Sequence, residues 1–404
     1  MNLDSPLPYS RGVSSQRRWQ VRELSVLILL TGLAAWLFRD SRLDLLAARV
    51  FYHPDNTFDP WYEQNYPLWD FFYRAAPWFT AFLLLGSLLV QGRAALVPRW
   101  RALRRDAVLV FLVVALGPGL VVNAVFKPYW GRPRPREVVE LGGKHQYRPF
   151  YSPALGASGK SFPCGHCSIG FSMGVFWWIG LRRRGRPTGY GALILGGSLL
   201  VGSLMGVGRM AAGGHFLSDV VWAGLMVYWV CYWLHYHLLE LLWRQRRLPT
   251  NHEGRGNRHR ALVLSAYGVL AVITVIVILV ASPFHSDVQL IARPSTGEKE
   301  LVFEIENARV DLTLDEQIPT AFELKGYAKG FGFPGGKVRA FCERQGFKES
   351  CWVKRQGFFS DFESVIHLTV NPRLVPRFNL RALRGEIFRD KVLNLPADYR
   401  IEND

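Results

Sequence analysis

The residues with the clearest chemical potential lie in SFPCGHCSIGF, which occupies positions 161–171. Its centre, Cys164-Gly165-His166-Cys167, is a CxxC pair with a histidine inside it. Two cysteines at this spacing, where a helix begins, can hold a reactive thiolate, so a thiol oxidoreductase is one interpretation. That interpretation requires a thioredoxin-like βαβ context, whereas an Arg- and Pro-rich segment precedes this stretch and an apolar run follows it.

Two other polar groups also stand at the ends of apolar runs. They are KPYWGRPRPRE at 127–137, with Lys127, Arg132, Arg134 and Arg136, and GRMAAGGHFLSD at 208–219, with Arg209, His215 and Asp219. Ionisable residues at such places are costly and indicate function. Taken singly, each has a simpler explanation, because the cations could bind lipid headgroups and Asp219 could cap a helix.

Together, the three groups predict a site for a substrate with concentrated negative charge. Arginine forks and a lysine match phosphate oxygens, and the Gly165 amide at a helix start can add a donor. His215 and Asp219 are four apart, so Asp219 can fix the imidazole tautomer and leave the other nitrogen free to attack. His166 can protonate a leaving oxygen. This equipment suits covalent phosphoryl transfer, and we expect neither metal nor cofactor, since no Asp/Glu cluster suited to Mg²⁺ stands beside it.

These blocks resemble the three signature motifs of the type 2 phosphatidic acid phosphatase superfamily of membrane lipid phosphatases. The first, K-x6-R-P, matches Lys127, Arg134 and Pro135. The second, P-S-G-H, is similar to the segment 163–166, and the third, S-R-x5-H-x3-D, matches Arg209, His215 and Asp219. The resemblance covers about 120–235 and implies a six-helix core, but it does not reach the last apolar run or the tail.

The resemblance implies a role for each matching residue. His215 is the nucleophile, Asp219 orients it, and His166 is the acid for the leaving group and then the base for water. Phosphate is held by Lys127, Arg134 and Arg209 with the Gly165 amide. Arg132 is a possible additional phosphate ligand outside the motif spacing. Cys164 stands where the family has a serine that donates to a phosphate oxygen, so it is a further phosphate-binding candidate, although a thiol is the weaker donor. Gly208 replaces a second family serine.

The rest of the chain predicts a polytopic membrane protein. It has 404 residues and a formal charge of +17, but its arginines form short clusters between apolar runs, which argues against nucleic-acid binding. Seven apolar runs are candidate membrane helices: Leu24–Phe38, Pro67–Val90, Ala107–Phe126, His166–Leu181, Tyr190–Val207, Asp219–Leu234 and Ala261–Ala281. A spanning helix needs about 20 mostly apolar residues, so the first and fourth runs are short and need flanking residues to complete them.

Arginine clusters occupy every second loop, which predicts that the N-terminus and these loops are cytoplasmic. The clusters are Arg11, Arg17, Arg18 and Arg22; Arg93, Arg99, Arg101, Arg104 and Arg105; Arg182, Arg183, Arg184 and Arg186; and Arg244, Arg246, Arg247, Arg255, Arg258 and Arg260. The three polar groups then face the periplasm of a bacterial inner membrane. We expect no cleaved signal at the first run.

The tail alternates apolar and polar residues in ELVFEIENARVDLTL and SVIHLTVNPRL, with Gly and Pro in KGFGFPGGK between them. This pattern predicts a β-rich, sandwich-like domain, on the periplasmic side if the orientation holds. Cys342 and Cys351 are a possible disulfide there. The predicted organisation is a six-helix membrane domain at 1–243, a basic cytoplasmic loop at 244–260, a seventh helix at 261–281 and the β-rich domain at 283–404.

The predicted function is a metal-independent lipid phosphate or pyrophosphate phosphatase acting through a phosphohistidine. Candidate substrates are undecaprenyl pyrophosphate, lipid A phosphate, phosphatidate and phosphatidylglycerol phosphate. Transfer of the phosphoryl group to another lipid is the first alternative, and a non-catalytic lipid-binding protein is a further one. Besides the lipid substrate and the bilayer, the tail could engage an envelope partner or a glycan.

Overall fold

A computed structural model of the protein describes residues 8–56, 59–157, 159–184, 187–238, 257–280, 282–292, 300–306, 308–357, 359–383, 386–389 and 396–403. The chain forms two compact units, a helical one at Met1–Val275 and a β-rich one at Ile276–Asp404. The division falls inside the last helix. Of the predicted basic loop 244–260, positions 244–256 lie outside the described residues, and the last helix begins at Asn257.

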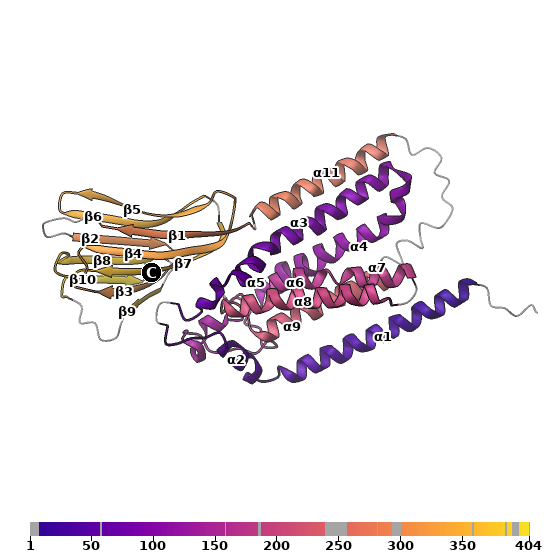
Figure 1. Cartoon of the computed structure of the whole chain (residues 1–404), viewed down its shortest axis with the longest axis horizontal. Coiled ribbons are helices and arrows are strands. Elements are labelled where there is room, and N and C mark those ends of the chain that lie inside the picture. The colour runs from indigo at the N-terminus through magenta and orange to yellow at the C-terminus, as the bar shows by residue number, and fades with distance from the viewer. Residues whose placement is uncertain are drawn as a thin grey trace, which may run out of the picture. The chain divides into compact units, whose positions relative to one another are not determined.

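The helical unit contains long apolar helices joined by short helical turns (Figure 1). Its α-helices are α1 Pro8–Leu37, α2 Arg42–Arg49, α3 Pro67–Leu96, α4 Arg104–Val114, α5 Lys127–Tyr129, α6 Gly165–Ser172, α7 Val175–Arg184, α8 Gly189–Ala211, α9 Leu217–Trp233 and α11 Asn257–Val280. The other turns are η1 Tyr62–Asn65, η2 Pro98–Leu103, η3 Ala115–Phe126, η4 Pro135–Glu137, η5 Val139–Leu141 and η6 Leu234–Leu238, of which η3 and η6 are π-helical.

Five helical segments among the described residues are long and apolar enough to cross a membrane: Arg17–Leu37, Pro67–Leu96, Pro98–Tyr129, Gly189–Ala211 and Leu217–Leu238. The fourth predicted run is instead two short helices, α6 and α7, separated at Met173 and Gly174. In the seventh run the described apolar stretch is Leu264–Val280. The chain is therefore a multi-pass membrane protein with a mainly helical core.

Local sequence explains where two of these helices begin. Pro67 occupies the first turn of α3, where its missing amide costs nothing, and the Thr188 hydroxyl caps α8 by accepting from Gly191 N at 3.0 Å.

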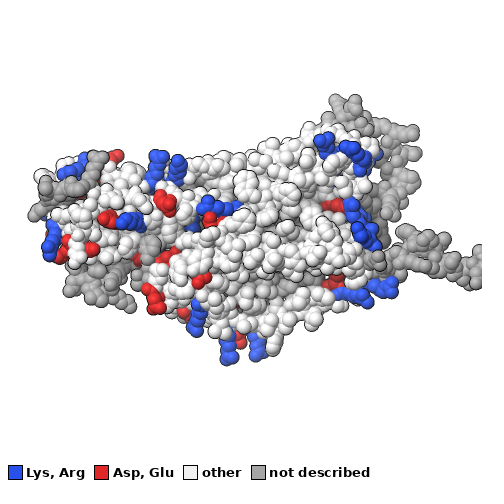
Figure 2. Space-filling model, viewed as in Figure 1, with Lys and Arg blue, Asp and Glu red and all other residues white. Residues whose placement is uncertain are grey.

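The start of α1 and the ends of α3 and α7 lie at one end of the helical unit (Figure 1). Figure 2 shows Lys and Arg at that end, beside a broad region with few charged side chains.

Close packing of small residues brings α6 against α8. A Cβ atom on Gly170 would lie 2.6 Å from Gly202 Cα, and one on Gly202 would lie 2.4 Å from the Phe171 ring. Glycines at both positions therefore allow the two backbones to approach, as is common between membrane helices. This contact fixes the start of α6 relative to the end of α8, where two of the predicted motifs lie.

The β-rich unit is a sandwich of two five-stranded sheets, as the alternating pattern predicts. Its strands are β1 Pro283–Ile291, β2 Glu300–Glu306, β3 Ala308–Leu314, β4 Phe322–Gly332, β5 Lys337–Gln345, β6 Lys348–Gln356, β7 Phe359–Val370, β8 Arg377–Leu383, β9 Glu386–Arg389 and β10 Tyr399–Asn403. The sheet orders are β1-β4-β7-β3-β9 and β10-β8-β2-β6-β5. Both sheets are mixed: among the described strands, the first has antiparallel and parallel pairs, and in the second β5–β6 is antiparallel beside parallel pairs.

Alternate residues of the two sheets meet in one apolar core. Phe303 of β2 and Phe322 of β4 are both fully buried, and their rings meet edge to face with centroids 5.0 Å apart. On the hairpin of β5 and β6, Cys342 lies directly opposite Cys351, and the structure joins the pair in a disulfide with Cα atoms 4.1 Å apart.

Candidate active site

The three sequence motifs meet at the ends of helices in the helical unit. Lys127 begins α5, Arg134 precedes η4, His166 lies in the first turn of α6, Arg209 lies in the last turn of α8, and His215 and Asp219 flank the start of α9. Two backbone hydrogen bonds connect the motifs: Arg136 N donates to Gly213 O at 3.1 Å, and Cys164 N donates to Asp219 O at 3.2 Å.

His215 is buried and held through its Nδ1 atom. Nδ1 lies 2.5 Å from the carbonyl oxygen of Ser161 and 3.7 Å from Asp219 Oδ2. A carbonyl oxygen can only accept, so Nδ1 carries the proton and donates it. The other ring nitrogen, Nε2, is then the unprotonated atom with a lone pair for attack. The predicted orienting contact with Asp219 is thus the longer of the two contacts at Nδ1.

Asp219 is fully buried and organises the backbone around His215. Its Oδ2 atom accepts from the Ser161 hydroxyl at 2.6 Å and from Phe216 N at 2.7 Å. Its Oδ1 atom accepts from Arg132 Nη1 at 2.5 Å. Asp219 therefore holds both the residue that precedes α9 and the residue whose carbonyl receives His215 Nδ1.

His166 stands among the cations that the motifs supply. Its ring stacks on Tyr73 of α3, with centroids 5.1 Å apart and planes 13° apart. The Arg209 guanidinium lies over the same Tyr73 ring, 5.2 Å from its centroid. The residues close enough to act electrostatically on His166 are Arg209, Lys127, His215 and Arg134. This convergence places both predicted histidines and the three predicted phosphate ligands in one neighbourhood.

Arg209 is the cation whose environment most directly indicates an anionic ligand. Its Nε atom is buried and has no hydrogen-bond partner in the part of the chain that the structure describes. A Cβ atom on Gly214 would lie 2.7 Å from Arg209 Nη2, so the guanidinium packs closely against Gly214 and would have to shift to admit a larger residue there. A buried donor without an acceptor is unfavourable, and a phosphate oxygen would satisfy it.

The start of α6 offers backbone donors to the same region. Gly165 is its first residue, and the preceding Cys164 makes no side-chain capping hydrogen bond. The first backbone N–H groups of a helix have no acceptor within the helix, so they can donate to an anion. A Cβ atom on Gly165 would lie 2.5 Å from Asn123 Oδ1, so glycine also allows η3 to approach here.

The two cysteines of the CxxC motif are both free and fully buried. The Cys164 thiol lies against the His215 imidazole, and the Cys167 thiol donates to Cys164 O at 3.3 Å. A thiol that exchanges with a protein disulfide has to be accessible. The burial of both thiols argues against the oxidoreductase interpretation, and it leaves Cys164 beside the predicted nucleophile.

Arg132 lies among carboxylates rather than among the phosphate ligands. It is fully buried, and its guanidinium pairs with Asp219 and with Asp44 of α2, the latter at 2.7 Å. Burial lowers the pKa of Arg132, but the carboxylates of Asp219 and Asp44 outweigh burial and hold the pKa above its ordinary value. The guanidinium is therefore fully charged where it supports Asp219.

Sequence reasoning missed three residues of this site. Ser161 belongs to the quoted motif segment, so its position five residues before His166 was a usable signal. Tyr73 lies in an apolar run rich in aromatic residues, and nothing local distinguishes it. Asp44 is 88 residues from Arg132, and an acid in a short amphipathic segment gives no sign of that contact.

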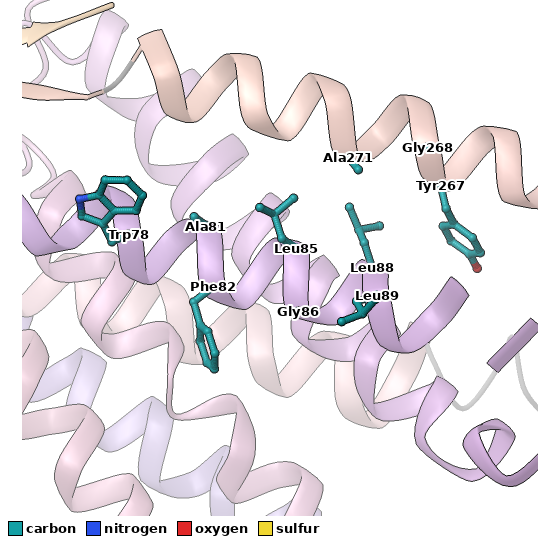
Figure 3. A pocket seen from close by; sticks show the side chains of 10 residues that line it. All are labelled: Trp78, Ala81, Phe82, Leu85, Gly86, Leu88, Leu89, Tyr267, Gly268 and Ala271. Carbon is teal, nitrogen blue, oxygen red and sulfur yellow. The ribbon is translucent and has the colours of Figure 1, made fainter. Parts of the chain in front are cut away.

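A separate pocket in the helical unit contains none of the predicted site residues. Its volume is about 790 Å³, and it lies between α3 and α11. Figure 3 shows side chains of both helices lining it: Trp78, Ala81, Phe82, Leu85, Gly86, Leu88, Leu89, Tyr267, Gly268 and Ala271. This apolar lining suits hydrocarbon rather than a phosphate.

Comparisons with known proteins bear on the family of the chain. A model of the PAP2 superfamily matches residues 107–244. The chain is 35% identical over 220 residues to the lipid A 4'-phosphatase of Francisella tularensis subsp. novicida (strain U112), a match that covers 51% of this chain and 93% of that protein. The crystal structure of a transmembrane PAP2-type phosphatidylglycerolphosphate phosphatase from Bacillus subtilis matches 57% of this chain and 98% of its own, with 18% identity and a TM-score of 0.34. The family model and the relative thus confirm the resemblance read from the motifs, and the chain belongs to the type 2 phosphatidic acid phosphatase (PAP2) superfamily of membrane phosphatases.

Proposed function

We propose that this membrane lipid phosphatase hydrolyses its substrate through a phosphohistidine on His215. The observation that carries the proposal is the hydrogen bond of His215 Nδ1 to the Ser161 carbonyl oxygen. It fixes the tautomer in which Nε2 is the nucleophile. The neighbourhood of that imidazole supplies an acid–base residue, His166, and an anion-binding cation, Arg209.

In the first step His215 Nε2 attacks phosphorus and the bond to the lipid oxygen breaks. The proton that the leaving oxygen needs comes from His166. Water then attacks the phosphohistidine, His166 accepts a proton from it, and inorganic phosphate leaves. The negative charge on the transferring group is held by Lys127, Arg134 and Arg209 and the Gly165 amide, a purely protein-based set of donors.

The position of the site along the helices supports action on the periplasmic side. His166 lies in the first turn of α6 and Arg209 in the last turn of α8, whereas the arginine cluster Arg182, Arg183 and Arg184 ends α7, between these two helices in the sequence. Arginine-rich ends favour the cytoplasm. We place the site at the outer surface of a bacterial inner membrane on that basis.

The substrate we propose is the 4'-phosphate of lipid A. The relative with that activity is 35% identical, and the match spans 93% of its length. The experiment is a phosphate-release panel with the purified full chain over lipid A, undecaprenyl pyrophosphate, phosphatidate and phosphatidylglycerol phosphate. We expect lipid A to give the highest kcat/KM, with the 4'-phosphate lost in mass spectra of the product.

Matched controls separate the mechanism from the substrate. His215→Ala should abolish phosphate release on every lipid, and EDTA should leave the wild-type rate unchanged. Retained activity in His215→Ala, or loss of activity with EDTA, would overturn the mechanism. A preference for another lipid would overturn only the substrate, and phosphate appearing on a second lipid instead of in solution would show transfer rather than hydrolysis.

A further inference from the structure

Three buried charged residues, Asp44, Arg132 and Asp219, form a hydrogen-bonded network that reaches His215 through Ser161. One of them, Asp44, lies outside the residues that match the family model. At its centre Arg132 is fully buried, and Asp44 and Asp219 are both fully buried beside it. Asp44 lies on α2, whereas the family match begins at residue 107. Such a cluster is costly to bury unless its members are paired and hydrogen-bonded.

All five N–H donors of the Arg132 guanidinium are used inside the protein. Nη1 donates to Asp219 Oδ1 at 2.5 Å and to Ser218 Oγ at 2.8 Å. Nη2 donates to Asp44 Oδ2 at 2.7 Å and to the Tyr147 hydroxyl at 3.1 Å. Nε donates to the carbonyl oxygen of residue 148 at 2.8 Å. No donor is left for a phosphate oxygen, so Arg132 is not a ligand of the substrate.

Asp44 is satisfied in the same complete way. Its Oδ2 atom accepts from the Ser218 hydroxyl at 2.6 Å and from the Tyr147 hydroxyl at 2.9 Å, besides Arg132. Its Oδ1 atom accepts from Ser218 N at 2.8 Å. Burial raises the pKa of Tyr147, and the Asp44 carboxylate raises it further, so the phenol stays protonated and donates.

The Ser218 contacts connect Asp44 to the nucleophile. Ser218 is in the first turn of α9, where backbone amides lack helical partners, and Asp44 caps that amide from another helix. The next residue is Asp219, which holds the Ser161 hydroxyl, and the Ser161 carbonyl accepts from His215. Arg132 thus holds the Asp219 carboxylate, and Asp44 holds the first turn of α9.

We propose that Asp44 and Arg132 are positioning residues for the phosphatase reaction. They lock the carboxylate of Asp219, and through Ser161 they hold the His215 imidazole in line for attack. The two carboxylates also exceed the single guanidinium by one negative charge, which favours the imidazolium that forms when Nε2 bonds to phosphorus. The proposal rests on His215 being the nucleophile proposed above.

The test is steady-state phosphate release by the purified full chain on the lipid that it turns over best. Asp44→Asn should lower kcat by about 100-fold, since a displacement of about 1 Å at the reacting centre can cost that much. KM should stay within about twofold of wild type, because neither residue contacts the substrate. Asp40→Asn is the matched control: it removes an exposed carboxylate from the same segment and should leave both constants unchanged.

A second pair of variants keeps the test decisive if Asp44→Asn fails to fold. Ser218→Ala and Tyr147→Phe each remove one hydroxyl from the network and retain every charge. In protein that remains folded, each should lower kcat about 10-fold with KM nearly unchanged, apart from the stability lost with a buried hydrogen bond. A merely structural network would lower the melting temperature and leave the kcat of folded protein intact.

Two results would overturn the proposal. One is a folded Asp44→Asn protein with kcat within about threefold of wild type. If that variant does not fold, wild-type kcat in both Ser218→Ala and Tyr147→Phe would overturn the proposal instead. The other is a raised KM at unchanged kcat, which would indicate substrate contact instead. Activity in His215→Ala would refute the nucleophile itself, so the two failures are distinguishable.

Discussion

His215 and Ser161 are joined by a contact of 2.5 Å between the imidazole Nδ1 atom and the backbone carbonyl oxygen. The acceptor is main chain, so no side-chain substitution removes it directly. What can change is the position of the carbonyl, and the Ser161 hydroxyl controls that position through its 2.6 Å bond to Asp219. The tautomer of the proposed nucleophile therefore depends on a serine beside the second motif.

Ser161→Ala removes that hydroxyl and keeps the carbonyl. We expect kcat to fall about 10-fold, the effect of losing a hydrogen bond to a charged group of about 1.5 kcal/mol, with KM nearly unchanged. Phosphate release at saturating substrate measures it. Ser172→Ala is the control, because Ser172 is equally buried in α6 and its hydroxyl donates to the helix carbonyl of residue 169, away from Asp219. Equal losses in both variants would contradict the assigned role.

Gly214→Ala tests the packing of Arg209. The new Cβ atom would lie 2.7 Å from Arg209 Nη2 and displace the guanidinium from the anion site. We expect kcat/KM to fall by at least 10-fold, since a bidentate phosphate contact depends on geometry. Gly197→Ala on α8 is the control, because no heavy atom lies within 4 Å of its added Cβ. If Gly214→Ala keeps the wild-type kcat/KM, Arg209 does not bind the phosphate in the position described.

Cys164→Ser restores the residue that the family motif carries. A hydroxyl donates to a phosphate oxygen more strongly than a thiol does, so we expect kcat/KM to rise severalfold. The variant also removes any disulfide between Cys164 and Cys167, so its rate should be the same with and without dithiothreitol. If Cys164→Ser is slower than wild type, a stronger donor at this position does not help to hold the phosphate, and the expected contact of residue 164 with a phosphate oxygen is wrong.

The cross-strand disulfide should matter to the β-rich unit and not to the chemistry. A bridge spanning nine positions stabilises by about 2–3 kcal/mol through the unfolded chain. Cys342→Ala/Cys351→Ala should accelerate proteolytic cleavage within 283–404 of the full chain while phosphate release stays unchanged. Loss of phosphate release in this variant, with the helical unit intact, would show that the β-rich unit takes part in turnover.

The sequence predicted the parts of this protein that depend on local patterns. Motif spacing identified both histidines and Asp219, apolar runs located the long helices, and alternation located strands such as β2 and β7. The break at Met173 and Gly174 was missed, because an uninterrupted apolar run gives no sign of where a helix bends. Arg132 was interpreted as a possible phosphate ligand, because the sequence alone does not show whether an arginine is paired with carboxylates inside the protein.

The contacts that decide these roles are long-range. Asp44 meets Arg132 across 88 residues, and Ser161 meets Asp219 across 58. Their partners are specified by how α2, α6 and α9 pack, and a single sequence does not encode such packing in any local spacing. Tyr73, which stacks on His166, belongs to the same class.

The central claim is that the phosphoryl group passes through His215. The most direct measurement is rapid mixing of the full chain with excess lipid phosphate, an alkaline quench that preserves phosphohistidine, and mass spectrometry of the peptides. The account predicts one phosphorylated peptide with the phosphoryl group on His215, absent from His215→Ala. A phosphoryl group on another residue, or turnover by His215→Ala at the wild-type rate, would contradict it.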